Sequence, residues 1–118
     1  MNRFISHLLT NLVSITCLAT SALGDHNTPS LSNLHADSFK IGVALNPREI
    51  RGEDASAALL IEQHFNAITA EDDIKWERIE PTEGNFDWAV ADEFVALGER
   101  NGAFMIGHTL LWHSQTPD

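Results

Sequence analysis

The stretch WAVADEFVALGERNGAFMIGH, residues 88–108, contains a helical pattern followed directly by a strand pattern. Asp87 precedes the helical pattern and is a candidate N-cap, while Gly102 is typical of the left-handed residue that ends a helix. We therefore expect a helix over residues 88–100 and a strand over residues 103–108. The apolar residues of the helical pattern are Val90, Phe94 and Leu97.

Two further strand patterns precede this stretch, with a second helical pattern between them. FKIGVAL (39–45) alternates bulky and small residues, and NAITA (66–70) is a short apolar run between polar residues. Residues 54–65 have apolar residues at helical spacing, with Asp54 as the candidate N-cap. The order strand, helix, strand, helix, strand, without hairpin signals, predicts parallel strands joined by crossover helices.

The remaining parts of the chain are polar. Residues 25–37 contain Pro29 with several serines and asparagines, which predicts a flexible N-terminal segment, with ordered structure beginning at Ser38. PTEG, residues 81–84, is typical of a turn. The sequence therefore predicts one α/β unit from residue 38 onward.

Three parallel strands make an incomplete sheet. Both outer strands would leave unpaired edges, and one apolar face would lack helices to cover it. A (β/α)8 barrel needs about 250 residues, and an open doubly wound sheet also usually has more strands. We therefore expect the 118 residues to be a truncated part of a larger α/β fold.

Residues 1–24 have the pattern of a secretory signal peptide. Arg3 provides a positive start, the stretch LVSITCLATSALG is mostly apolar, and Ala22-Leu23-Gly24 resembles a cleavage site. A membrane anchor is the alternative, but polar residues interrupt a run shorter than the ~20 apolar residues that a spanning helix needs. A lipid anchor on Cys17 is a further alternative. We expect cleavage and secretion to an extracellular or periplasmic location.

Charge and cysteine content narrow the classes of partner. Cys17 is the single cysteine, so residues 25–118 hold no disulfide and no thiolate metal site. In those residues six basic side chains face seventeen acidic ones, a net charge of −11. This balance argues against nucleic acid and, after signal cleavage, against a membrane as partner. A neutral substrate is favoured.

Polar and aromatic residues follow the second and third predicted strands. In parallel α/β folds the loops at the carboxyl ends of the strands line the functional crevice, so these residues are the candidates for a site. They are Glu71, Asp72 and Lys75 after the second strand, and His108, Trp112, His113 and Gln115 at and after the third.

The first group has two interpretations. Glu71, Asp72 and Lys75 offer acceptors and donors for sugar hydroxyls, but they also fit an acidic start of a short helix over residues 74–79. A catalytic carboxylate pair is disfavoured, because neighbours on an extended segment point to opposite sides. Retaining glycosidases need their carboxyls about 5–5.5 Å apart across one bond.

The second group also has alternatives. His108 and His113 are five positions apart with no clear third ligand, so a metal site is disfavoured and His108 fits a structural role. Trp112 fits either a core residue or an indole that stacks on a sugar ring. The sequence has no GxSxG elbow, phosphate-binding glycine loop, HExxH motif or basic stripe.

Several long motifs resemble a known family. KIGVAL (40–45), QHFNAITAEDDIKWERIEPTEGNFDW (63–88), Ala91-Asp92 and GHTLLWHSQTPD (107–118) together resemble the start of the catalytic domain of glycoside hydrolase family 10, the endo-β-1,4-xylanases. The resemblance runs from about Phe39 to Asp118. It implies a (β/α)8 TIM barrel, of which this chain holds about the first three strands.

The resemblance also implies an activity. Family members hydrolyse xylan with retention and without a cofactor, using an acid/base glutamate near the end of strand four and a nucleophilic glutamate near the end of strand seven. Neither glutamate falls on a residue of this sequence, so we expect the parent enzyme to be an endo-1,4-β-xylanase and the 118 residues alone to be inactive. The parent is expected to be a monomer that binds xylan or xylo-oligosaccharide.

The resemblance assigns sugar contacts on the glycone side of the cleavage point. Glu71, Asp72 and Lys75 would contact the distal xylose with Gln115 nearby, and two further residues, His108 and Trp112, would hold the sugar at the scissile bond. The family usually has Asn where this chain has Asp72, and an ionised Asp accepts hydrogen bonds without donating them.

Two other functions stay open. A related barrel glycosidase acting on cellulose or mixed-linkage glucan would need space near Glu71 and Lys75 for a glucose hydroxymethyl group. A non-catalytic sugar-binding protein is the third hypothesis, from another functional class.

Overall fold

Three short parallel strands form the sheet in the computed structural model, which describes residues 28–117. The strands are β1 (Gly42–Leu45), β2 (Ala67–Ala70) and β3 (Phe104–Ile106). They lie in the order β1-β2-β3 with both pairs parallel, and the register aligns Ile68 with Val43 on one side and Met105 on the other. The predicted parallel topology is therefore confirmed.

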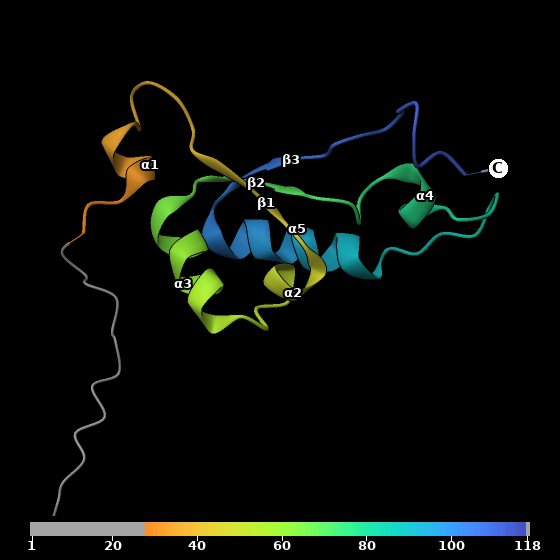
Figure 1. Cartoon of the computed structure of the whole chain (residues 1–118), viewed down its shortest axis with the longest axis horizontal. Helices are drawn as coiled ribbons and strands as arrows, with labels where there is room; N and C mark the ends of the chain where they lie inside the picture. Colours follow the sequence, from red (N-terminus) through yellow and green to blue (C-terminus); the bar gives the residue numbers. More distant parts are fainter. Residues whose placement is uncertain (1–27, 118) are drawn as a thin grey trace, which may run out of the picture.

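Two longer helices make the crossovers between the strands. They are α3 (Ala55–His64) and α5 (Ala89–Asn101), and a single turn, α2 (Pro47–Ile50), follows β1. Figure 1 shows α2, α3 and α5 together on one side of the strands. This arrangement buries one face of the sheet and directs the chain after β2 and β3 toward the same end of the molecule (Figure 1).

The apolar core lies between the sheet and these helices. Leu45 and Ile68 from the strands are fully buried or nearly so, and they pack in one cluster with residues of α2, α3 and α5. Apolar burial of this kind is the main favourable term in folding, at about 25 cal/mol per Å². The other members of the cluster are Ile50, Ile61, Ala70, Phe94 and Leu97.

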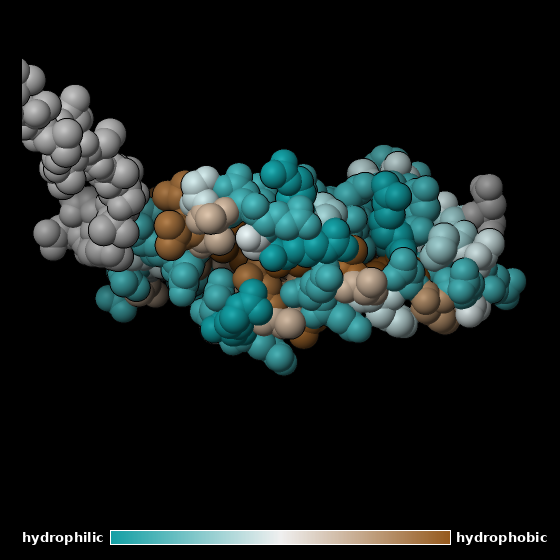
Figure 2. Space-filling view, turned by 90° about the horizontal axis from the view of Figure 1, so that it is seen from below, coloured by the Kyte–Doolittle hydropathy of each residue, from teal (hydrophilic) through white to brown (hydrophobic). Residues whose placement is uncertain are grey.

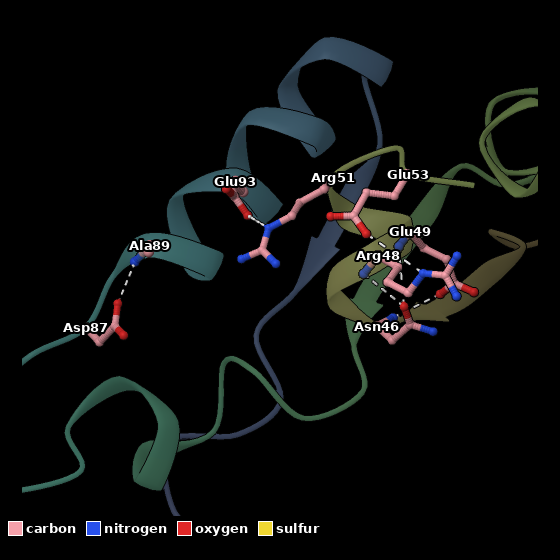
Figure 3. Close-up of polar contacts among 8 residues, drawn as sticks. All are labelled: Asn46, Arg48, Glu49, Arg51, Glu53, Asp87, Ala89 and Glu93. Carbon is pink, nitrogen blue, oxygen red and sulfur yellow. Dashed lines mark hydrogen bonds and ion pairs between the residues drawn. The ribbon is translucent and has the colours of Figure 1, made fainter. Parts of the chain in front are cut away.

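Side-chain caps fix where the helices begin and end. Asp54 accepts hydrogen bonds from the backbone at the start of α3, as predicted. Asp87 Oδ1 accepts from Ala89 N at 3.0 Å, although Trp88 is the residue in the N-cap position of α5 (Figure 3). Gly102 has a φ of 60°, the left-handed conformation predicted for the end of α5.

The turn α2 was not predicted from the sequence, since the patterns described above stop at residue 45 and resume at residue 54. Asn46 and Glu49 form a capping box, in which each side chain accepts a hydrogen bond from the other residue's backbone N–H (Figure 3). A half-exposed ion pair of 2.8 Å between Arg51 and Glu93 then ties α2 to α5 (Figure 3).

The element boundaries differ from the predicted ones in three places. All three strands are shorter than expected, and at the start of β1 the Asn66 side-chain Oδ1, not a backbone oxygen, accepts the Ile41 N–H. A four-residue helix, α1 (Leu31–Leu34), lies within the segment predicted to precede ordered structure, and it packs near α3. The short helix expected over residues 74–79 is confined to α4 (Trp76–Ile79).

The predicted turn and the predicted signal peptide have different outcomes. Residues 81–84 form a turn closed by a bridge between Thr82 and Asn85, with Gly84 at a positive φ of 75°. The signal peptide over residues 1–24 lies outside the described residues and stays a prediction. Within residues 28–117 no helix is long and apolar enough to cross a membrane.

Many large apolar side chains remain on the surface. The face seen in Figure 2 is mostly hydrophilic, with smaller apolar patches along it. Leu59 and Leu60 of α3 are more than half exposed, and so are Phe104 of β3 and Leu110 in the following segment. An apolar surface of this extent is typical of a sheet whose other face and edges lack packed neighbours.

Candidate functional site

The candidate residues lie on two segments at the carboxyl end of the sheet. One segment, residues 71–79, follows β2 and includes α4, and the other, residues 107–117, follows β3. Figure 1 shows the C-terminal segment returning beside α4. The strand ends therefore bring together residues that are about forty positions apart in sequence, as the parallel topology predicted.

Lys75 is the buried charge of this region. Its side chain is only 8% exposed, and it is the residue at the N-cap position of α4. Its ammonium donates to the backbone oxygen of Glu71 and lies 3.4 Å from Asp72 Oδ1. Burial of a charge is costly unless partners compensate it, so these contacts make the buried ammonium possible. An ammonium has three N–H groups, of which these two contacts use two.

Asp72 accepts hydrogen bonds from three side chains. Gln115 Nε2 and Lys75 Nζ contact Oδ1, and Arg78 Nη2 lies 3.2 Å from Oδ2. The Gln115 hydrogen bond is the main cause that lowers the pKa of Asp72; burial, the next largest effect, raises it, and hydrogen bonds from Arg78 and Lys75 lower it further. Asp72 is therefore ionised at neutral pH. We call Asp72, Lys75, Arg78 and Gln115 the polar cluster.

Gln115 joins the two segments through both its side chain and its backbone. Its amide donates to Asp72, and its backbone oxygen accepts from Glu77 N at 3.0 Å. Gln115 has a φ of 54°, which is uncommon for a residue other than glycine. These contacts hold the chain after β3 against α4 at a defined position.

Trp112 lies at the surface rather than in the core, with 38% of the residue exposed. Its ring centroid is 5.7 Å from Lys75 Nζ, a cation–π distance. His108 and His113 both contact the indole edge-on, with ring centroids 6.3 and 5.0 Å away. Of the two interpretations of Trp112, this exposure favours a ring that is available to a ligand.

Glu71 is exposed, and no hydrogen bond to its carboxylate is found within residues 28–117. Its backbone N–H donates to Leu45 O, which continues the β1–β2 contact beyond the strand. Glu71 and Asp72 both precede the N-cap of α4, whose first turn contains Glu77 instead. Glu71 and Asp72 therefore lie outside the first turn of α4, and their interpretation as the acidic start of this short helix stays open.

Sequence reasoning missed Arg78 as a member of the cluster. The residue follows Asp72 by six positions, partly in a loop, where no periodic pattern predicts contact. Its position in the last turn of α4 aims the guanidinium back at the loop. The other candidate residues were found because they follow strand ends.

A separate apolar pocket lies beside the polar cluster. It has a volume of about 390 Å³ and lies between α4, the start of α5 and residues 107–110. Trp76, Trp88, Thr109 and Leu110 are among the residues of its lining, and no residue of the polar cluster contributes to it. Such a lining suits an apolar group rather than a ligand rich in hydroxyls.

The described residues offer little for a metal ion. Within residues 28–117 no group of three or more His, Cys, Asp or Glu side chains is placed to hold one. The ammonium, amide, carboxylate and indole of the cluster instead form a set that hydrogen-bonds to hydroxyls and stacks on flat apolar faces.

Comparison with known proteins identifies relatives of the chain. The family model for Glycosyl hydrolase family 10 matches residues 30–118. Endo-1,4-beta-xylanase A from Caldicellulosiruptor sp. (strain Rt8B.4) is 41% identical over 93 residues, which are 79% of this chain and 13% of that protein. Exoglucanase XynX from Acetivibrio thermocellus is 43% identical over 93 residues, or 79% of this chain and 8% of that protein.

Solved structures show the same local fold. Xylanase B from Clostridium stercorarium F9 superposes with a TM-score of 0.71 at 43% identity, over 77% of this chain and 26% of that one. A mutant protein solved in complex with xylotriose gives a TM-score of 0.70 at 33% identity, over 76% and 26% of the two chains. The present chain thus spans about a quarter of these structures, and less of the two curated relatives.

These matches agree with the three parallel strands and crossover helices, which form part of the (β/α)8 barrel of the structural neighbours. The family model covers most of the sequence, including both segments that carry the candidate site. This chain belongs to Glycosyl hydrolase family 10.

Proposed function

We propose that the strand-end segments of this chain form the glycone-side wall of a xylan-binding cleft. The observation that carries the proposal is the convergence of Asp72, Lys75 and Gln115 beside the exposed Trp112. Glu71 and His108 complete the set of proposed sugar contacts. The distal xylose would be contacted by Glu71, Asp72, Lys75 and Gln115, and the sugar of the scissile bond by His108 and Trp112.

The chemistry of this wall suits a neutral sugar. The third N–H of Lys75 and the free carboxylate of Glu71 provide a donor and an acceptor for hydroxyl groups. The exposed indole of Trp112 offers an apolar face for a pyranose ring. A xylotriose complex among the structural neighbours supports the same class of ligand.

We further propose that the whole barrel containing this segment is an endo-1,4-β-xylanase that hydrolyses β-1,4-xylosidic bonds with retention. The family match and the xylanase relatives support this activity. The 118 residues alone are proposed to bind without cleaving, because the family resemblance puts both catalytic glutamates on strands beyond the three described here. Secretion through residues 1–24 and a monomeric parent belong to the same proposal.

Ligand titration of the chain tests the binding proposal. Xylotriose added to a chain beginning at residue 25 should quench or shift the tryptophan fluorescence, and a Trp112→Phe variant should lose that signal. Trp88→Phe, a change in an exposed tryptophan of the separate apolar pocket, is the matched control and should keep it. An unchanged response in Trp112→Phe, or none in the parent chain, contradicts the proposed site.

A reducing-end assay tests the second part of the proposal. The 118 residues should release no reducing ends from xylan. A chain extended through the whole barrel should do so and give the β-anomer first, as retention requires. Release by the 118 residues alone contradicts the proposed position of the catalytic groups.

A glucan substrate is the second candidate, because Exoglucanase XynX is among the relatives. A glucose ring carries a hydroxymethyl group that xylose lacks, and this group would need space beside Glu71 and Lys75. Comparison of cellotriose with xylotriose decides between the two. Xylotriose should bind at least tenfold more tightly if the cleft is built for xylan, and equal affinities favour the glucan alternative.

A further inference from the structure

The side-chain amide of Gln115 has a defined orientation because of its partner. A glutamine amide can present either its oxygen or its NH2 group to a neighbour. Asp72 is ionised and accepts hydrogen bonds only, so Gln115 must present Nε2 to it. The Gln115 Oε1 atom then faces away from Asp72.

The charge of Asp72 is itself held by two cations. Arg78 contacts Oδ2 at 3.2 Å from the outer side, and Lys75 contacts Oδ1 at 3.4 Å from the buried side. Both residues donate hydrogen bonds and cannot accept them. The three side chains that contact the Asp72 carboxylate in the described structure, those of Lys75, Arg78 and Gln115, all donate to it and so favour its ionised form.

We propose that Asp72 and Arg78 are a positioning pair that fixes the Gln115 amide, so that Gln115 Oε1 accepts a hydrogen bond from a sugar hydroxyl in the cleft. In addition to its proposed contact with the distal xylose, Asp72 then acts on the sugar through Gln115, and Arg78 acts through Asp72. This inference rests on the proposed function, since it assumes that the cleft binds a xylo-oligosaccharide.

The proposal gives a physical meaning to the acidic residue at position 72. The family pattern described above has Asn there, and an asparagine amide can either donate to Gln115 Oε1 or accept from Nε2. Both orientations of Gln115 would then be open. With Asp72 only one orientation remains, so the cleft presents an acceptor at Gln115 and a donor at Lys75.

The orientation of the amide can be measured without a ligand. The sequence has two glutamines, Gln63 and Gln115, so two pairs of side-chain NH2 signals are expected after ¹⁵N labelling of glutamine. Gln115→Glu assigns them. The Gln115 signals should move as the pH falls through the titration of Asp72, whereas those of Gln63, which donates to Thr28 O, should stay in place.

Variants of the pair sharpen this measurement. Arg78→Gln removes the outer cation and should move the midpoint of the Gln115 titration to higher pH. Asp72→Asn should abolish the titration. Any of three results overturns the proposed positioning role. The Gln115 signal could lie at its random-coil position, could fail to titrate, or could titrate equally in Asp72→Asn.

Exchanging the donor at Gln115 and the acceptor at Asp72, by Gln115→Glu and Asp72→Asn, tests the consequence for sugar binding. Gln115→Glu keeps an oxygen toward the sugar but sets a second carboxylate against Asp72, so xylotriose should bind about tenfold more weakly, given the value of a hydrogen bond to a charged group. Adding Asp72→Asn supplies a donor to the new carboxylate and should restore most of the affinity. Equal losses in the single and double variants overturn the inference.

The two proposals fail in different ways. If the parent chain binds no xylotriose while the Gln115 signal still titrates with Asp72, the proposed function is wrong and the positioning of the amide stands. If xylotriose binds but Asp72→Asn gives no rescue, the function stands and the positioning role is wrong.

Discussion

The core beneath the sheet and the polar cluster at the strand ends are held together by different forces. Leu45 and Ile68 are almost completely buried and need only apolar neighbours of the right volume. Asp72 and Arg78 have about half of their side chains exposed and depend on directed contacts between particular atoms. Substitutions in the core should therefore mainly change stability, whereas substitutions in the cluster should mainly change ligand binding and the response to pH.

The largest change in stability is expected from a substitution in the core. Leu45→Ala removes a fully buried side chain where β1 meets α2, and it should lower the free energy of unfolding by about 2–5 kcal/mol. Urea denaturation followed by circular dichroism measures the change. Leu110→Ala, at a residue that is 93% exposed, is the control and should change it by less than about 0.5 kcal/mol. Similar losses in the two variants contradict a core at Leu45.

The second effect depends on how closely α5 approaches the sheet. A Cβ added at Gly98 would overlap the Met105 thioether, so Gly98→Ala should destabilise the chain by about 1–3 kcal/mol. Without that contact the same change would stabilise a helix by about 1 kcal/mol. The sign of the change in unfolding free energy therefore reports the packing of the helix on β3.

Met105→Ala provides the matched background for this test. With the thioether removed, the added methyl at position 98 has space, so the cost of Gly98→Ala should largely disappear. An equal cost with and without Met105 contradicts the packing contact.

The difference between the two regions also explains what could be predicted from the sequence. The parallel sheet, the Asp54 cap of α3 and the Gly102 end of α5 were predictable because each depends on neighbours within a few residues or on apolar periodicity. The turn α2 was missed although its signal, Asn46 followed three residues later by Glu49, is present in the sequence.

The polar cluster was predictable only in part. That Asp72, Lys75 and Gln115 lie together follows from their positions after neighbouring parallel strands and from the family resemblance. The pairing of Arg78 with Asp72 follows from the geometry of one short helix after an irregular loop, which no periodic pattern encodes. The exposure of Trp112 likewise depends on how residues 107–117 return to α4.

A third prediction concerns the unpredicted turn. Asn46→Ala removes the acceptor of the capping box and should lower the free energy of unfolding by about 1 kcal/mol. Asn46→Ser keeps an oxygen that can accept from the same backbone N–H groups and should cost much less. Urea denaturation of the two variants measures the difference, and equal stabilities would show that the cap does not stabilise α2.

A fourth prediction separates the cluster from the core by pH. The pKa of Asp72 is lowered by folding, so its contacts stabilise the chain above the ordinary aspartate pKa and are lost as the pH falls through the lowered value. Thermal stability should therefore fall below about pH 4. The pKa values of Asp54 and Glu80 are also lowered, by hydrogen bonds from Ser56 and Gly84 respectively, so part of the fall is theirs.

Asp72→Asn isolates the contribution of the cluster to this fall. The variant should lose less stability between pH 5 and pH 3 than the parent chain, while the remaining dependence should persist. Thermal unfolding at a series of pH values measures both. Identical pH profiles for the two chains contradict a stabilising role of the ionised Asp72.

The smallest expected effect lies between the two regions, at the ion pair that joins α2 to α5. Arg51 and Glu93 are 2.8 Å apart, but both side chains are more than a third exposed, so water and salt screen their attraction. A double-mutant cycle with Arg51→Ala and Glu93→Ala should give a coupling of about 0.5 kcal/mol or less, falling further in 1 M NaCl. A coupling above about 1 kcal/mol that survives salt would mean that the pair is shielded from solvent. In that case a polar contact would contribute to the stability of the core region, which the comparison of Leu45 with Asp72 assigns to apolar burial alone.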